Sequence, residues 1–207
     1  GENAYLPFAD PPQSWSPPPR AVALRRMIRQ RRSAVAMDGQ TRLSREDFYR
    51  MLDRTLAVPG AVPFNALPWK SQLHLALLVH RVDDLPRGLY LLVRDPAQKV
   101  VLEQALTQAD PWHKPPGCPE QLPLYCLMER DTRAAAREIS CQQDIASDGC
   151  FSLAMLAAFS GPLERYGPWF YPRLYWEAGM IGQQLYLEAE AAGVRSTGIG
   201  CFFDDPM

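Results

Sequence analysis

The 207-residue chain has little net charge, few histidines and no long hydrophobic run. Its 22 Lys and Arg residues nearly balance its 23 Asp and Glu residues, which leaves a net charge of −1. No excess of positive charge therefore favours nucleic acid or an anionic membrane surface. No apolar run approaches the roughly 18 residues that a membrane-spanning helix needs. We expect neither nucleic acid nor a membrane as a partner.

Cysteine is scarce and shows no pairing pattern, since the five residues are an odd number without a CxxC pair. This argues against a disulfide scaffold and favours a reducing cytosol, and the first residues do not resemble a signal peptide. His113, Cys118 and Cys126 lack the usual zinc spacing, so no metal site is expected. The absence of a nucleophile motif, a GxGxxG motif and a P-loop disfavours a hydrolase and a Rossmann-type nucleotide-binding protein.

The patterns that are present predict one α+β domain. Proline-rich residues 1–20 predict an extended arm, and residues 21–207 a single domain of ordinary size. Apolar residues at helical spacing predict helices over 21–33, 44–57, 132–146 and from 175 onward, the second opened by Ser44 with Asp47 three residues later. Short apolar runs predict strands over 73–80, 89–96, 151–160 and 196–203, and 151–160 is expected at the centre of the sheet.

The strand over 73–80 has only His74 and His80 as polar residues, so we expect both faces of the sheet to be covered. The helix that begins at Tyr175 places small residues among the apolar ones of one stripe, which allows another backbone to approach closely. That stripe is Ala178, Ile181, Gly182, Leu185 and Ala189. Packing onto the sheet and packing onto a partner helix are both consistent with it.

Two further features are consistent with a bound ligand. Gly198 and Gly200 flank Ile199, which exposes backbone N–H groups and leaves room for a flat molecule. Arg31 and Arg32 precede Ser33 where a helix is expected to end. Guanidinium groups suit bidentate phosphate binding, although a solvated basic helix end, favourable to the helix dipole, explains the same residues.

Taken together and in this order, the segments resemble the FMN-dependent nitroreductase superfamily, most closely its SagB-type flavin dehydrogenases, which include azoline oxidases of peptide maturation. The resemblance rests on RRS at 31–33, LVHRVDDLPRGLY at 78–90, CQQDIASDG at 141–149 and the stretch 175–205. It implies a nitroreductase-like fold, with a central, mostly antiparallel sheet flanked by helices, in an intertwined homodimer that holds FMN at the subunit interface. Relatives continue beyond the position of Met207, through a helix and a strand with further flavin contacts.

The resemblance also assigns cofactor contacts to residues in three segments. The residues that bind the FMN phosphate and ribityl chain in relatives are matched by Arg31, Arg32 and Ser33. The segment PSAGALYP, which lines the flavin in relatives, is matched by the segment that holds Asn65, Ala66 and Trp69. The strand beside the isoalloxazine ring is matched by Ile199, Gly200 and Cys201. Ala66 replaces the serine of that motif. Core packing is the alternative role of Trp69.

The candidate catalytic residues depart from those of azoline-oxidising relatives. Those relatives have a Lys-Tyr pair, thought to remove a proton, where this chain has Arg165 and Tyr166. Arginine does not release its proton at ordinary pH, and a phenol with a pKa near 10 needs help to act as a base. The implied function is hydride transfer through flavin N5 to or from a small-molecule or peptide substrate, with NADH or NADPH as the candidate reductant. The alternative is a flavin-fold module that has lost catalysis and binds a partner protein.

Overall fold

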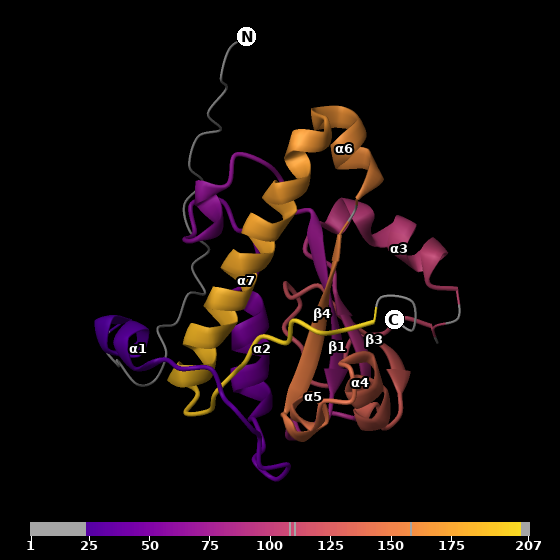
Figure 1. The fold of residues 1–207 in the computed structure, drawn as a ribbon. Coiled ribbons are helices and arrows are strands. Elements are labelled where there is room, and N and C mark those ends of the chain that lie inside the picture. The colour runs from indigo at the N-terminus through magenta and orange to yellow at the C-terminus, as the bar shows by residue number, and fades with distance from the viewer. Residues whose placement is uncertain (1–23, 108, 110, 158, 204–207) are drawn as a thin grey trace.

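The structure is a computed structural model that describes residues 24–107, 109, 111–157 and 159–203 (Figure 1). The proline-rich arm predicted over 1–20 lies outside these residues. The elements are α1 (Leu24–Gln30), α2 (Arg45–Asp53), η1 (Phe64–Ala66), β1 (Leu73–Val79), β2 (Gly88–Leu92), η2 (Pro96–Gln98), α3 (Lys99–Ala105), β3 (Leu124–Glu129), α4 (Arg133–Ile139), α5 (Asp144–Asp148), β4 (Phe151–Ala157), α6 (Ser160–Tyr166), η3 (Pro168–Phe170) and α7 (Tyr171–Ala191). None of the helices in the described part has the length and hydrophobicity needed to cross a bilayer.

The strands form one antiparallel sheet in the order β3-β2-β1-β4. β1 lies between β2 and β4, and Leu77 faces Tyr90 on one side and Leu153 on the other. The predicted strand over 151–160 is present as β4, but its predicted central position is wrong, because within the described residues β4 pairs only with β1. An apolar run predicts burial but does not say which neighbours provide it.

Helices cover both faces of the sheet, as predicted. One face carries Leu75 and Leu77, which are fully buried in a core shared with Phe48 of α2 and Ile181 of α7. The other face carries a smaller cluster of Leu91, Val93 and Leu127, against which residues of the α3 region pack. Figure 1 shows α7 running the length of the molecule on one side of the sheet and α3 on the other.

The two histidines of the first strand are buried, each 2% exposed. Their ring nitrogens have backbone partners: the Arg94 N–H donates to His74 Nδ1 (3.1 Å), and His80 Nε2 lies 3.2 Å from the Ala146 carbonyl oxygen. Burial lowers the pKa of His80 to about 4, so the imidazole is neutral near pH 7.

The first two predicted helices are confirmed in shorter form. In α2, the Ser44 side chain accepts a hydrogen bond from the Asp47 N–H (3.0 Å), and the buried side of the helix includes Phe48 and Leu52. A serine cap stabilises a helix because it satisfies a backbone donor that has no partner within the first turn.

The single helix predicted over 132–146 is wrong, because the chain forms α4 and α5 with a break between them. Cys141 and Gln142 both have positive φ angles, 55° and 62°, and two successive left-handed residues end a right-handed helix. Cys141 forms a disulfide with Cys201, which the odd cysteine count and the missing CxxC pair did not predict.

The strand predicted over 196–203 is also absent; these residues form neither a strand nor a helix. They run from the end of α7 across to α4, where the Phe203 N–H donates to the Ile139 carbonyl (2.8 Å) (Figure 1). Gly198 and Gly200 leave the backbone flexible, and none of the strands in the described part of the chain pairs with this segment.

Candidate functional site

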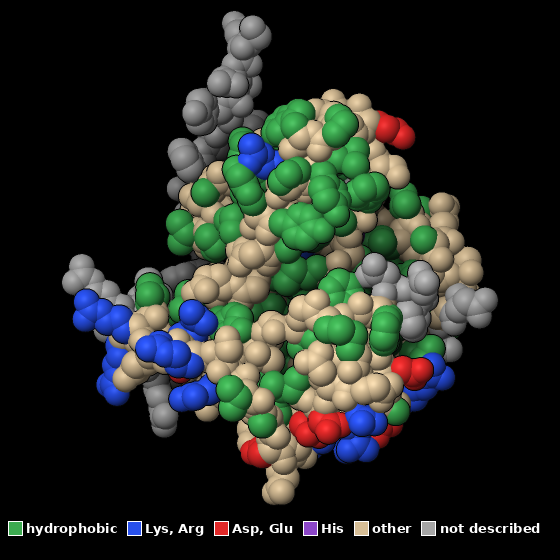
Figure 2. All heavy atoms as spheres, in the orientation of Figure 1, with side chains coloured by type: hydrophobic (Ala, Val, Ile, Leu, Met, Phe, Trp, Pro, Cys, Tyr) green, Lys and Arg blue, Asp and Glu red, His purple; other side chains and the backbone are tan. Residues whose placement is uncertain are grey.

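Helix α7 connects the two parts of the candidate site. Its inward side, which includes Glu177, Ile181 and Ala189, is buried against the core. Its outer side leaves Tyr175 62% exposed and Trp176 54% exposed. Figure 2 shows hydrophobic side chains gathered over this part of the surface.

A buried ion pair fixes the N-terminal half of α7. Arg94 and Glu177 are in contact, and neither side chain is exposed to solvent. Glu177 also accepts the Gln72 N–H (3.0 Å), and Arg94 donates to the carbonyls of Thr55 (2.8 Å) and Leu73 (3.1 Å). A buried charge needs partners of this kind, so the pair sets the position of the helix relative to β1.

The C-terminal half of α7 carries Tyr186, which joins two of the segments predicted to bind a cofactor. The Tyr186 hydroxyl lies 2.9 Å from Ser33 Oγ and accepts the Gly198 N–H at 2.8 Å. The Arg31 guanidinium lies over the Tyr186 ring, 4.8 Å from its centroid. A backbone bond from the Ala34 N–H to the Ser196 carbonyl (3.0 Å) holds the same two segments together. We call Arg31, Ser33, Tyr186 and Gly198 the Tyr186 cluster.

The charge at this end is basic. Within the described residues, Arg29, Arg31 and Arg32 form no salt bridge with an acidic side chain, and Figure 2 shows Lys and Arg side chains gathered over α1. Arg32 points back and donates to the carbonyls of Arg29 (3.0 Å) and Arg31 (2.8 Å), so it closes the end of α1. Arg31 thus remains available for an anion, whereas Arg32 has a structural role.

The glycine segment lies beside the Tyr186 cluster and is open. A Cβ built on Gly200 would meet no atom within 4 Å, and Gly200 and Cys201 are exposed while Ile199 is half-buried. Cys201 is bonded to Cys141, so its sulfur is not a free thiol beside a ligand. The segment therefore offers open backbone, anchored at one end by Tyr186 and at the other by the disulfide.

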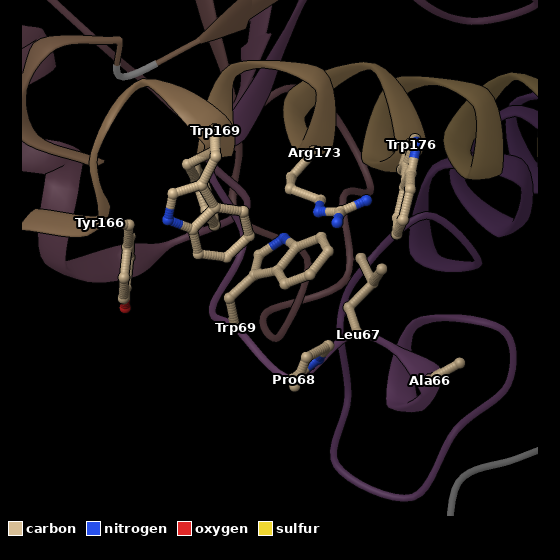
Figure 3. Close-up of a pocket in the computed structure, with 9 residues that line it drawn as sticks. Ala66, Leu67, Pro68, Trp69, Tyr166, Trp169, Arg173 and Trp176 are labelled. Carbon is tan, nitrogen blue, oxygen red and sulfur yellow. The ribbon is translucent and has the colours of Figure 1, made fainter. Parts of the chain in front are cut away.

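The third predicted segment lies at the other end of α7. Ala66 and Trp69 line an open pocket of about 370 Å³, together with Trp169, Arg173 and Trp176 (Figure 3). The Arg173 guanidinium lies 3.5 Å from the centre of the Trp176 ring, and Figure 3 shows it between Trp69 and Trp176. The indole nitrogen of Trp69 is buried without a hydrogen-bond partner in the described residues. We call this the Trp69 pocket.

Tyr166 also lines the Trp69 pocket, whereas Arg165 does not. The Tyr166 ring stacks on Phe170 with 4.8 Å between centroids. Arg165 is exposed in the last turn of α6, and its guanidinium lies over the Tyr166 ring at 5.1 Å. Asn65 is exposed in η1 and is not among the residues that line the pocket.

Within one chain the predicted site residues thus fall into two groups. Trp176, in the Trp69 pocket, and Tyr186 are ten positions apart on α7, which corresponds to about 15 Å along the helix axis. The chain brings Arg31, Ser33 and Gly198 together, and it brings Ala66, Trp69 and Tyr166 together. The Tyr186 cluster and the Trp69 pocket of one chain do not meet.

No family model matches the sequence, and no curated protein matches it. A crystal structure of a "putative nitroreductase" from Anabaena variabilis superposes with a TM-score of 0.66 at 21% sequence identity, over 88% of this chain. The chain has a nitroreductase-like fold. It spans about a third of the length of that protein, since the match covers 33% of the other chain.

Sequence reasoning missed several residues that build the two groups. Tyr186 lies between Leu185 and Leu187 on α7, and nothing in its spacing points to Ser33 or Gly198. Trp169, Arg173 and Trp176 are spaced i, i+4 and i+7, so helical periodicity places them on one side, and this was a usable signal.

Proposed function

We propose that the protein is an FMN-dependent oxidoreductase of the nitroreductase type, related to the SagB-type dehydrogenases. The Tyr186 cluster carries this proposal, because it holds a guanidinium, a hydroxyl and a backbone segment on one surface. A phosphate dianion binds where fixed positive charge and hydroxyl donors meet. The nitroreductase-like fold supports the same proposal.

The residues at this end of α7 fit an FMN molecule. Arg31 has no acidic partner within the described residues, and the backbone around Gly200 borders open space that a side chain would fill. Arg31 and Ser33 would hold the phosphate and ribityl end, and Tyr186 would orient Ser33 through their 2.9 Å contact. Residues 198–200 would lie along the flat ring. FMN supplies the hydride-transfer chemistry when bound, and the protein supplies orientation and electrostatics.

The complete site would be shared by two copies of the chain. A two-fold axis perpendicular to α7 places the N-terminal half of one helix beside the C-terminal half of its partner. The Trp69 pocket of one protomer would then face the Tyr186 cluster of the other and cover the cofactor from the opposite side. Gly179 and Gly182 support this arrangement, because a Cβ on either would meet nothing within 4 Å in its own chain. The small residues are therefore not needed for packing within the protomer.

The reaction should need no strong protein base. Arg165 is exposed and a guanidinium cannot serve as a general base, and Tyr166 stacks on Phe170 rather than contacting a carboxylate or histidine within the described residues. We propose that NADH or NADPH reduces the enzyme and that a small-molecule or peptide substrate accepts the electrons. Azoline oxidation should be absent or slow.

The first experiment is an FMN titration followed by flavin fluorescence. Wild-type protein should bind saturably, and Arg31→Ala should weaken binding by about tenfold or more, because a charge-assisted hydrogen bond is lost. Arg26→Ala is the matched control, since Arg26 is exposed on α1, which ends just before Arg31, and bonds only to Gln30 among the described residues. Equal affinity in wild type and Arg31→Ala would overturn the assignment.

Subunit mixing tests the shared site. Arg31→Ala and Trp69→Leu homodimers should each bind FMN poorly, and mixing them should restore binding, because half of the sites in a mixed dimer are intact. Recovery on mixing would not occur if both residues served one chain's site. Bound FMN that neither NADH nor NADPH reduces would favour the non-catalytic module.

A further inference from the structure

Three side chains with metal-binding atoms meet at the β3 edge of the sheet, away from α7. The Nδ1 or Nε2 of His113, the thiol of Cys126 and a carboxylate oxygen of Glu129 all lie within 4.8 Å of one another. Cys126 is buried, whereas His113 and Glu129 are exposed. We propose that this cluster binds a zinc ion through one sulfur, one nitrogen and one oxygen ligand.

The backbone brings the first two ligands together. His113 and Cys126 form an isolated antiparallel bridge, with the Cys126 N–H donating to the His113 carbonyl at 2.9 Å and the reverse bond at 3.4 Å. Residues that face each other in such a pair project their side chains to the same face. The imidazole is therefore held next to the thiol by the main chain.

A β-bulge brings in the third ligand. Cys126 and Glu129 are three positions apart, so regular alternation would place them on opposite faces of β3. The register with β2 shifts between Leu89 and Tyr90, so that Tyr90 faces Cys126 while Gly88 faces Glu129. The extra residue, Leu127, is buried in the cluster on the other face. The bulge thus returns Glu129 to the face of Cys126, and bulges of this kind commonly re-aim a functional side chain.

The hydrogen bonds of His113 fit a metal ligand. Its Nδ1 lies 3.3 Å from the Pro111 carbonyl oxygen, which suits an Nδ1–H donor and leaves the Nε2 lone pair free. That Nε2 lies 3.3 Å from Glu129 Oε1, and in this tautomer a cation shared by the nitrogen lone pair and the carboxylate oxygen would stabilise their contact. Zinc-bound histidines usually donate their other ring N–H to a carbonyl or carboxylate in this way.

The donor set indicates zinc. Thiolate, imidazole and carboxylate are its usual ligands, and three protein ligands leave one tetrahedral position for water or a fourth group. The exposed His113 and Glu129 leave that position facing solvent. The sequence pattern considered His113, Cys118 and Cys126, but the proposed third ligand is Glu129 rather than Cys118. Because a β-bulge brings Glu129 to the face of Cys126, the spacing of these residues along the sequence does not reveal the site. Bound zinc would tie the segment around His113 to the β3 edge.

A cobalt titration tests the site in protein freed of any histidine tag. Co²⁺ bound by Cys126 should produce a thiolate charge-transfer band in the near ultraviolet that saturates at one equivalent and disappears when Zn²⁺ is added. His113→Ala and Glu129→Gln, both at exposed positions, should weaken Co²⁺ binding by about tenfold or more. Cys126→Ser should remove the band, and Cys118→Ser should leave it intact.

Two results would overturn the proposal. One is a wild-type titration without a saturable thiolate band. The other is a band that persists in Cys126→Ser or has the same affinity in His113→Ala. In the second case a direct hydrogen bond would account for the contact between His113 and Glu129.

Discussion

The disulfide between Cys141 and Cys201 should make a large contribution to stability, because it closes a long loop. The two residues are 60 positions apart, and the entropy lost by the unfolded chain on closing such a loop corresponds to about 4 kcal/mol at 25 °C. The native contacts near Cys201 are few: the Phe203 N–H donates to Ile139, and Gln143 Nε2 lies 3.4 Å from the Cys201 carbonyl. Part of the effect of reduction should therefore appear as release of residues 196–203 alone, so we expect a loss of about 2–4 kcal/mol.

Urea unfolding followed by tryptophan fluorescence measures this loss. Wild-type protein should unfold at a lower urea concentration with dithiothreitol than without it. Cys201→Ser should behave like reduced wild type and should not respond to dithiothreitol, which separates the disulfide from general effects of the reductant. Identical midpoints for oxidised and reduced wild type would refute the reasoning, as would alkylation of Cys201 in unreduced, denatured protein.

Other perturbations test the core, the pH response and the outer side of α7. Glu177→Gln leaves the buried Arg94 charge without its partner and should cost about 3–5 kcal/mol in urea unfolding. Glu103→Gln, in the half-buried surface pair with Lys99, should cost less than about 1 kcal/mol. Burial lowers the native pKa of His80 to about 4, so the unfolded chain binds a proton first as the pH falls below 6.5. The free energy of unfolding should therefore decline by roughly 3 kcal/mol between pH 6.5 and 4. His80→Gln should reduce this pH dependence. Gly182→Leu adds a side chain where its own chain leaves space, so sedimentation should show a folded monomer, and an unchanged dimer would contradict the proposed helix pairing.

Local signals predicted the elements that depend on local chemistry. Ser44 caps α2 because its hydroxyl reaches a donor three residues away, and that relation is visible in the sequence. The run over 73–80 is buried on both faces because its only polar side chains, His74 and His80, find backbone partners. Predicting such features requires no information about residues that are distant in the sequence.

The errors arose where distant segments decide the outcome. Residues 196–203 have the composition of a strand, but a strand needs an edge to pair with, and none lies beside them among the described residues. The predicted helix over 132–146 breaks at Cys141, which is bonded to a residue 60 positions away. β3 was not predicted, because the short run LYCLME is defined by its pairing with β2 and its bridge to His113 rather than by a local pattern.

The candidate site divides in the same way. Of the segments that the resemblance singled out, two lie together in the structure, because Arg31, Ser33 and Gly198 all contact Tyr186. The resemblance did not show that Trp69 packs against Trp176, about 15 Å along α7 from Tyr186, since that separation depends on how the chain folds.

The residues of α7 lie in two different surroundings. Ile181, Leu185 and Ala189 face the core, where their size is set by the sheet beneath them. Gly179 and Gly182 face open space, so nothing within the protomer requires their lack of a side chain. A glycine in a helix interior costs about 1 kcal/mol relative to alanine, and a second helix that packs closely against these positions would offset that cost. Because the Tyr186 cluster and the Trp69 pocket lie at opposite ends of that same side, the contact that explains the glycines would also join the two groups into one site.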